Sequence, residues 1–191
     1  MRAGEINAAD GEVCAMDGFA YRGIGVTGGV MTGLALPLRD ATDDLTPVSA
    51  TPRLDAELLM AHALRIDRSA MLLRQHDLDV PAVFAAMLAR RVADEPVAYI
   101  TGMQAFWDLD LHVTPDVLIP RSDSETLIEV AIAAFAGREA PARILDVGTG
   151  SGALLLAALS VFGEAQGVGI DASAAALAVA SGNAARLGLA D

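Results

Sequence analysis

Few residues of this sequence could build a covalent cross-link or a metal site. Cys14 is its one cysteine, which excludes an internal disulfide and any zinc site that uses several cysteines. The three histidines, His62, His76 and His112, lie far apart and match no spacing of metal ligands. We therefore expect no bound metal ion.

Long apolar runs and clustered positive charge are also missing. No uninterrupted apolar stretch reaches the roughly 18 residues of a membrane-spanning helix. The N-terminal stretch carries Glu5, Asp10 and Glu12, which fits neither a signal peptide nor an arginine-rich transit peptide. A net charge of −12 argues against binding a phosphate backbone. We expect a soluble cytoplasmic monomer that binds neither a membrane nor nucleic acid directly.

Four zones of different character follow one another along the 191 residues, of which 53% are hydrophobic and 4% aromatic. Residues 1–50 are glycine-rich, show no sustained period, and are predicted to form an irregular leader. Residues 51–95 are predicted to form a small helical domain, and residues 96–121 a β-hairpin linker. Residues 122–191 have the pattern of an α/β domain with a parallel sheet.

The helical zone begins with a capping signal. Thr51 is expected to cap a helix that has Pro52 at its first position. Leu54, Leu58, Leu59 and Ala61–His62 are predicted to form its apolar face. A short helix in "RSAMLLRQ" and another from Pro81 onward complete the predicted bundle.

Alternation of apolar and polar residues in "FWDLDLHV" predicts one half-exposed strand, with "VAYI" before the Thr101–Gly102 turn as its partner. Ser122 and Glu125 then fit a capping box for a helix that ends at Gly137. The apolar stripe of this helix is predicted to consist of Leu127, Ile128, Ala131, Ile132 and Phe135.

A βαβ unit is predicted from residue 142 onward. "ARILDVG" and "AQGVGID" are expected to be parallel strands, joined by a glycine loop and a helix over about 153–162. A last helix is expected to open at Ser173 and to end near Gly188. The predicted fold class is therefore α/β, preceded by helices and a hairpin.

The glycine loop suits a nucleoside-containing ligand. Gly148, Gly150 and Gly152 let the backbone turn sharply and approach a ligand closely, and the loop leads into a helix N-terminus. Asp171 follows Gly152 by nineteen residues, at the end of the second strand. A carboxylate at that place can accept both hydroxyl groups of a ribose.

Asp146 decides between two kinds of cofactor. "GTGSGA" satisfies the dinucleotide pattern literally, but a carboxylate beside a pyrophosphate would repel it. S-adenosylmethionine has no phosphate and carries an ammonium and a sulfonium group. The sign of the charge therefore favours S-adenosylmethionine.

These residues carry a resemblance to a known family. "ILDVGTGSGA" resembles the first motif of class I methyltransferases, which have a Rossmann-like domain. "EPVAYITG" followed by "FWDLDLHVTPDVLIPRSDSETLIE" is narrower and resembles the HemK family, protein-(glutamine-N5) methyltransferases that act on peptide chain release factors. The resemblance covers about residues 51–191. It implies that the helical domain recognises the substrate and that the side-chain amide of the glutamine in a Gly-Gly-Gln motif is methylated.

The same resemblance implies roles for individual residues. Asp146 would lie near the amino group of the cofactor, and Asp171 would hold the ribose. Phe106 and Arg121 would lie at the pocket mouth. The loop that would wrap the cofactor consists of Gly148, Thr149, Gly150, Ser151 and Gly152.

The family's Asn-Pro-Pro-Tyr motif, which is thought to hold the glutamine amide, is absent from the sequence. No residue present is therefore predicted to be catalytic. We expect an N-terminal fragment that binds cofactor poorly, transfers no methyl group and tends to aggregate.

Other interpretations remain open. The chain could belong to another class I methyltransferase, acting on a ribosomal protein or a nucleic-acid base. It could be a non-catalytic cofactor-binding or interaction module whose helices dock a partner. A nicotinamide-dependent oxidoreductase is disfavoured by Asp146.

Overall fold

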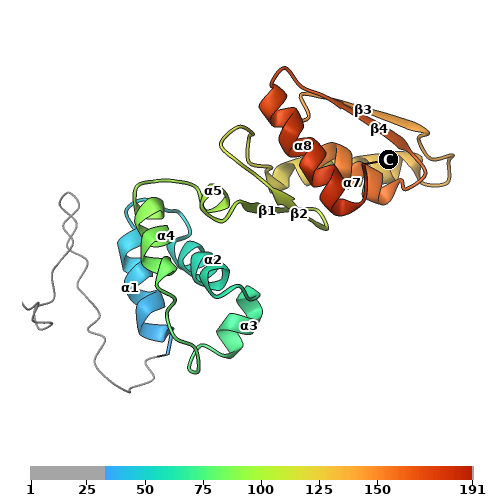
Figure 1. The fold of residues 1–191 in the computed structure, drawn as a ribbon. Helices are drawn as coiled ribbons and strands as arrows, with labels where there is room; N and C mark the ends of the chain where they lie inside the picture. Colours follow the sequence, from blue (N-terminus) through green and yellow to red (C-terminus); the bar gives the residue numbers. More distant parts are fainter. Residues whose placement is uncertain (1–32, 191) are drawn as a thin grey trace, which may run out of the picture. The chain divides into compact units, whose positions relative to one another are not determined.

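The computed structural model describes residues 33–190, which form eight α-helices, one 3-10 helix and four strands (Figure 1). The first 32 residues of the predicted leader lie outside the described residues. No helix within residues 33–190 is long and apolar enough to cross a membrane.

Five helices build the N-terminal part and share one apolar core that includes Leu59, Met60 and Phe84. They are α1 (Ala35–Leu45), α2 (Pro52–Leu64), α3 (Arg68–Leu73), α4 (Val83–Val92) and α5 (Val97–Thr101). The predicted bundle is therefore present, but it begins before residue 51.

Helix α1 corrects the prediction that the irregular leader extends to residue 50. It buries Leu38, Ala41 and Leu45 at a spacing of three to four residues, which places them on one helix face. Pro37 is tolerated because it lies in the first turn, where a backbone N–H has no intrahelical partner.

Helix α2 begins with Pro52 as predicted, but two details of the prediction are wrong. Thr51 makes no side-chain bond to the helix backbone; its hydroxyl donates to Asp55 Oδ1 at 3.1 Å. Leu54 and Leu58 are more than one third exposed. The buried face of α2 instead includes Asp55 and Glu57.

Each of these buried acids is paired with arginine from another element. Arg91 of α4 lies with its Nε 2.8 Å from Asp55 Oδ2, and Arg68 Nε donates to Glu57 at 2.8 Å. Arg53, one turn before Glu57, donates to the same carboxylate. Burial acts to raise the pKa of Glu57, but the bonds and charges of the two arginines outweigh it and hold the pKa below its usual value.

The hairpin lies elsewhere than predicted. β1 (Met103–Phe106) pairs antiparallel with β2 (Leu109–His112), while "VAYI" is helical and belongs to α5. The turn therefore falls inside "FWDLDLHV", at Trp107 and Asp108. Trp107 adopts φ +56, which is unusual for a bulky residue, and its N–H donates to Glu125 Oε1 at 3.1 Å.

That contact replaces the predicted capping box. Ser122 lies in the 3-10 helix η1 (Ser122–Ser124), and α6 (Glu125–Phe135) starts without a side-chain cap. Gly137 follows the end of α6 with φ +72, as expected for a helix stop. Of the predicted apolar stripe only Ile128 is buried.

The βαβ unit is present as predicted. β3 (Arg143–Val147) and β4 (Gln166–Ile170) pair in parallel, joined by α7 (Ala153–Val161), and α8 (Ala174–Leu187) follows. Ser173 caps α8 through its side chain, and Gly188 ends it at φ +71. The predicted α/β fold class is thus confirmed.

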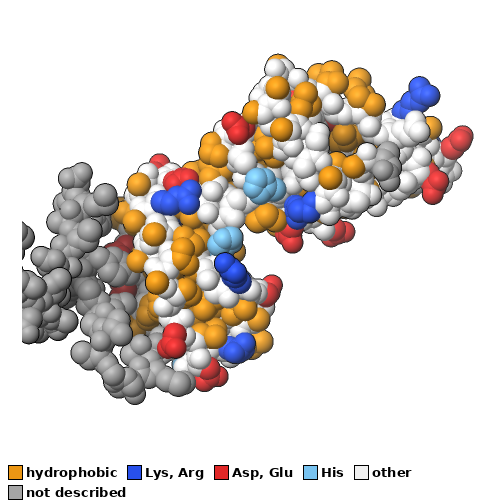
Figure 2. Space-filling model, in the orientation of Figure 1, with side chains coloured by type: hydrophobic (Ala, Val, Ile, Leu, Met, Phe, Trp, Pro, Cys, Tyr) orange, Lys and Arg blue, Asp and Glu red, His pale blue; other side chains and the backbone are white. Residues whose placement is uncertain are grey.

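One face of this two-stranded sheet is covered and the other is bare. Gly167 and Gly169 of β4 let α7 approach, because an added Cβ would lie 2.7 Å from Leu159 Cδ1 or 3.2 Å from Leu155 Cδ2. Figure 2 shows hydrophobic side chains at the surface over β3 and β4. The residues of the bare face are 46–72% exposed, and they are Leu145, Val147, Val168 and Ile170.

Replacing Glu57 by Gln should lower the free energy of unfolding near pH 7 by about 1–3 kcal/mol, because two arginines lose a charged acceptor. The lowered folded pKa means that the stabilisation is complete above the ordinary value of about 4.3 and is lost as the pH falls through the folded pKa. Urea unfolding of both proteins between about pH 7 and pH 3 measures this difference, which should shrink below about pH 4.3.

Glu129, exposed on α6, provides the matched control, and its change to Gln should alter stability by no more than about 0.5 kcal/mol. A Glu57 effect that stays constant down to about pH 3 would contradict the ion-pair explanation.

The bare sheet face predicts self-association of the 191-residue polypeptide, because exposed apolar patches of this kind bind one another. Val168→Lys should lower the mean mass seen by light scattering. Val83→Lys, at a similarly exposed position on α4, should leave it unchanged. Equal effects of the two substitutions would show that the sheet face is not the contact.

Candidate cofactor site

The glycine loop crosses the end of the sheet and is fixed there by the neighbouring strand. The backbone N–H groups of Gly148 and Thr149 both donate to the carbonyl oxygen of Ile170, at 2.8 and 3.0 Å. Gly148, Gly150 and Gly152 have φ values of +81, +55 and +83, a region that side-chain-bearing residues enter only at a cost. The sequence therefore needs glycine at these three positions.

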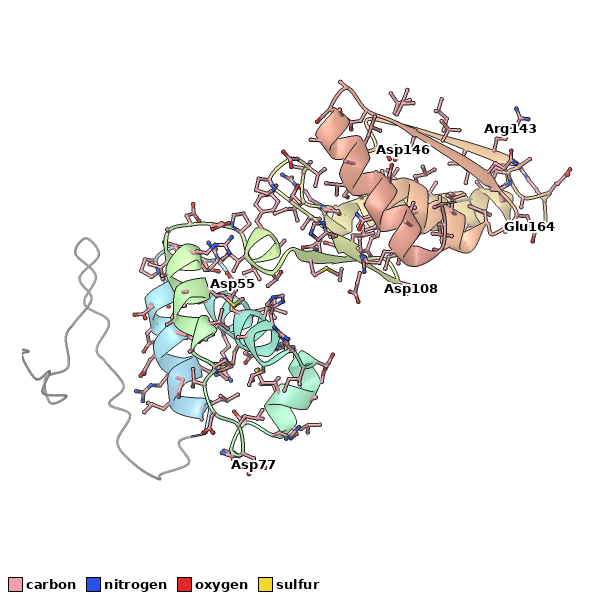
Figure 3. All side chains as sticks on the ribbon, viewed as in Figure 1. Asp55, Asp77, Asp108, Arg143, Asp146 and Glu164 are labelled. Carbon is pink, nitrogen blue, oxygen red and sulfur yellow. The ribbon has the colours of Figure 1, made fainter. Side chains whose placement is uncertain are left out.

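Asp146 is held at the entrance of the loop. The hydroxyl of Thr149 donates to Asp146 Oδ2 at 2.8 Å, and Thr149 itself is only 7% exposed. Asp146 lies toward the loop end of β3, whereas Arg143 lies at the opposite end, near Glu164 (Figure 3). The carboxylate is thus oriented by the same loop that it borders.

Asp171 contacts the loop from the end of β4. Its Oδ1 accepts from the N–H of Ser173, and its Oδ2 accepts from the N–H of Gly150, both at 2.9 Å. These backbone bonds, to Ser173 first and Gly150 second, hold the pKa of Asp171 below its usual value. The group is therefore an anion at neutral pH, and each oxygen keeps acceptor capacity for a ligand.

A pocket of about 170 Å³ brings most of the predicted site residues together. Phe106 of the hairpin and Arg121, just before η1, line it with the loop. The other predicted residues that line it are Asp146, Gly148, Thr149, Gly150 and Ser151. Gly152 faces Leu156 instead, and Asp171 reaches the site through its bond to Gly150.

The space in front of the loop is open. A Cβ added to Gly148 or Gly150 would meet no atom within 4 Å, so a ligand can approach the main chain there. The polar side chains that line this pocket are one carboxylate, one guanidinium and three hydroxyl groups, and Arg121 is the single cation among them. The Asp171 carboxylate lies beside the pocket through its bond to Gly150. These residues could hold a ligand with a cationic group and neighbouring hydroxyl groups, as the sequence predicts for S-adenosylmethionine.

Sequence reasoning missed some residues around the site. Leu118, Ile119 and Pro120 also line the pocket, and Asn183 of α8 is fully buried against the loop. "LIP" gave no chemical signal, and an asparagine within a helix is ordinarily expected on the solvated face. Across residues 33–190 no three potential metal-ligating side chains lie together.

Comparison with known proteins follows this division of the chain. A family model described as the PrmC N-terminal domain matches residues 38–102, and one described as a methyltransferase domain matches residues 139–191. The first match begins at residue 38, inside α1, in line with the corrected start of the bundle.

Curated proteins with similar sequences bear one name. The release factor glutamine methyltransferase of Bordetella pertussis is 46% identical over 148 residues, which are 76% of this chain and 54% of that protein. Those of Burkholderia pseudomallei and Rhodospirillum rubrum are 41% and 44% identical, over 75% and 72% of this chain and 51% and 43% of theirs. The chain spans about half the length of the curated relatives it matches, and the predicted family resemblance is confirmed.

Gly169→Ala tests how tightly the loop is packed, because the new Cβ would press against the Thr149 side chain that holds Asp146. We expect a loss of about 1–3 kcal/mol in the free energy of unfolding, measured by denaturant titration. Gly163→Ala is the control, since a Cβ there meets nothing within 4 Å. Equal stability of the two variants would mean that the Thr149 side chain can move away from the new Cβ at no cost, and that the loop is not tightly packed there.

Proposed function

We propose, because the chain belongs to the release factor glutamine methyltransferase family, that it forms the S-adenosylmethionine site of an enzyme that methylates a glutamine side-chain amide in peptide chain release factors. The observation that carries this proposal is the pocket in which the glycine loop, Asp146, Phe106 and Arg121 meet. The sequence similarity supports the substrate class, and the geometry of the pocket supports the cofactor.

The charges of the pocket suit the methionine end of the cofactor. That end is a zwitterion, with one ammonium and one carboxylate group. Asp146 offers a carboxylate already oriented by Thr149, and Arg121 brings a guanidinium to the same pocket. A diphosphate would gain from the arginine but would be repelled by the aspartate.

The ribose end is served by Asp171. Its two oxygens are held by the N–H groups of Gly150 and Ser173, so the carboxylate is already oriented before a ligand arrives. Two neighbouring hydroxyl groups can donate to two carboxylate oxygens at once, and such charge-assisted bonds are stronger than neutral ones. The lowered pKa of Asp171 keeps these acceptors charged at neutral pH.

S-adenosylmethionine, when bound, would supply an electrophilic methyl group. An amide nitrogen is a weak nucleophile, so the rate depends chiefly on position. Phe106, only 1% exposed, gives the pocket an apolar wall that limits water near the reacting groups. The loop amides and the two aspartates are the groups that would hold the cofactor in this pocket.

We propose further that the whole protein works in translation termination, in the cytoplasm, and as a monomer. Release factors are proteins, and a chain of net charge −12 contacts a protein surface more readily than a ribosomal or messenger RNA. Direct contact with nucleic acid is therefore not part of the proposal.

Calorimetry with S-adenosylhomocysteine and with NADH tests the cofactor. The full-length protein should bind the first and not the second, and Asp171→Ala should weaken the first by about 10–100-fold through loss of charge-assisted bonds. Asp108→Ala, at the exposed hairpin turn, should leave the affinity unchanged. Binding of NADH alone would overturn the cofactor assignment. An unaltered affinity in Asp171→Ala would contradict the proposed contact between Asp171 and the ribose.

A further inference from the structure

Asn183 of α8 is the most deeply buried polar side chain among residues 33–190, with no exposed surface. Glu57, in the helical bundle, is also buried, but arginines neutralise its charge. Asn183 carries no charge and lies between the backbone of β2 and that of the glycine loop. A buried amide is retained at such a position only if all of its polar atoms find partners.

All of them do. The N–H of His112 donates to Asn183 Oδ1 at 2.8 Å, and Asn183 Nδ2 donates back to the carbonyl oxygen of His112 at 2.9 Å. The second hydrogen of Nδ2 is given to the carbonyl oxygen of Ser151 at 2.9 Å. Arg186 adds a longer contact of 3.4 Å to Oδ1.

The bonds to His112 reproduce the exchange between neighbouring β-strands, in which one residue gives and takes a backbone bond. The side chain therefore extends the pairing of β2 on its outer edge. It does this 71 residues away from His112 along the chain, while holding Ser151, which is 32 residues away. One amide thus joins the hairpin to the glycine loop.

Both segments joined by Asn183 line the proposed cofactor site. Ser151 belongs to the loop and directly precedes Gly152, whose φ of +83 starts α7. β2 is paired with β1, which ends in Phe106, another residue that lines the same pocket. Any shift of the hairpin relative to the loop would change the distance between the two walls.

We propose that Asn183 is a positioning residue that sets the spacing between the hairpin and the glycine loop, and with it the affinity for the cofactor. The proposal rests on the proposed function only for the identity of the ligand. Asn183 does not line the pocket, and its three short bonds are to the backbone of His112 and Ser151, so it acts through those two residues.

Asn183→Ala removes all three bonds and should weaken S-adenosylhomocysteine binding by the full-length protein about tenfold or more. Hydrogen exchange should accelerate together in the amides of residues 109–113 and 148–152. Asn183→Asp keeps the acceptor for the His112 N–H but cannot donate to either carbonyl when ionised. Asn183→Asp should also weaken ligand binding and accelerate hydrogen exchange in both segments. It serves as the test variant if Asn183→Ala fails to fold.

Ala176→Gly is the matched control, because Ala176 is buried on the same helix but packs with Val113 and Val117. It should lower thermal stability without raising exchange in residues 148–152 or weakening the ligand. Faster exchange in the hairpin alone, or equal effects of the control in both segments, would overturn the proposal.

The two ideas fail separately. If the wild type binds no S-adenosylhomocysteine but Asn183→Ala raises exchange in both segments, the cofactor assignment falls and the coupling stands. If the wild type binds and both Asn183 variants bind equally well, the coupling falls and the proposed function stands.

Discussion

The parallel pairing of β3 with β4 brings the ends of both strands to one edge, and the glycine loop and both aspartates of the site depend on that edge. The carbonyl of Ile170 receives two N–H groups of the glycine loop, and Asp171, the next residue, receives a third. A loop of three positive-φ glycines has no regular structure of its own to hold it. Its shape is maintained because the neighbouring strand supplies the acceptors that the loop backbone would otherwise lack.

The charges near the loop restrict which ligands it favours. The loop and the helix N-terminus behind it would accept many anionic or nucleoside ligands. Asp146 narrows the choice, because its carboxylate lies at the loop entrance and is kept there by Thr149. In the proposed function the two aspartates have different roles: Asp146 would attract the cationic amino group, and Asp171 would accept the ribose hydroxyl groups.

The βαβ unit could be predicted from the sequence because its signals are local: a capping serine, a glycine stop, and glycines beside a strand. The hairpin was misplaced because the alternation in "FWDLDLHV" runs through the turn, whose Trp107 carries no turn signal and is fixed by Glu125. The prediction of the buried face of α2 is wrong because an acidic residue is ordinarily expected to be exposed. Its burial can be predicted only if its arginine partner is known, and Arg91 lies 36 residues from Asp55. Asn183 could not be found for the same reason. In each case the partner is distant in sequence and only the fold brings it close.

A crystal structure of the full-length protein with S-adenosylhomocysteine tests the central claim most directly. The account predicts the ribose hydroxyls within hydrogen-bonding distance of the Asp171 carboxylate, with the amino group of the ligand on the Asp146 side of the glycine loop. Adenosine bound away from the end of β4, or an amino group turned away from Asp146, would contradict it.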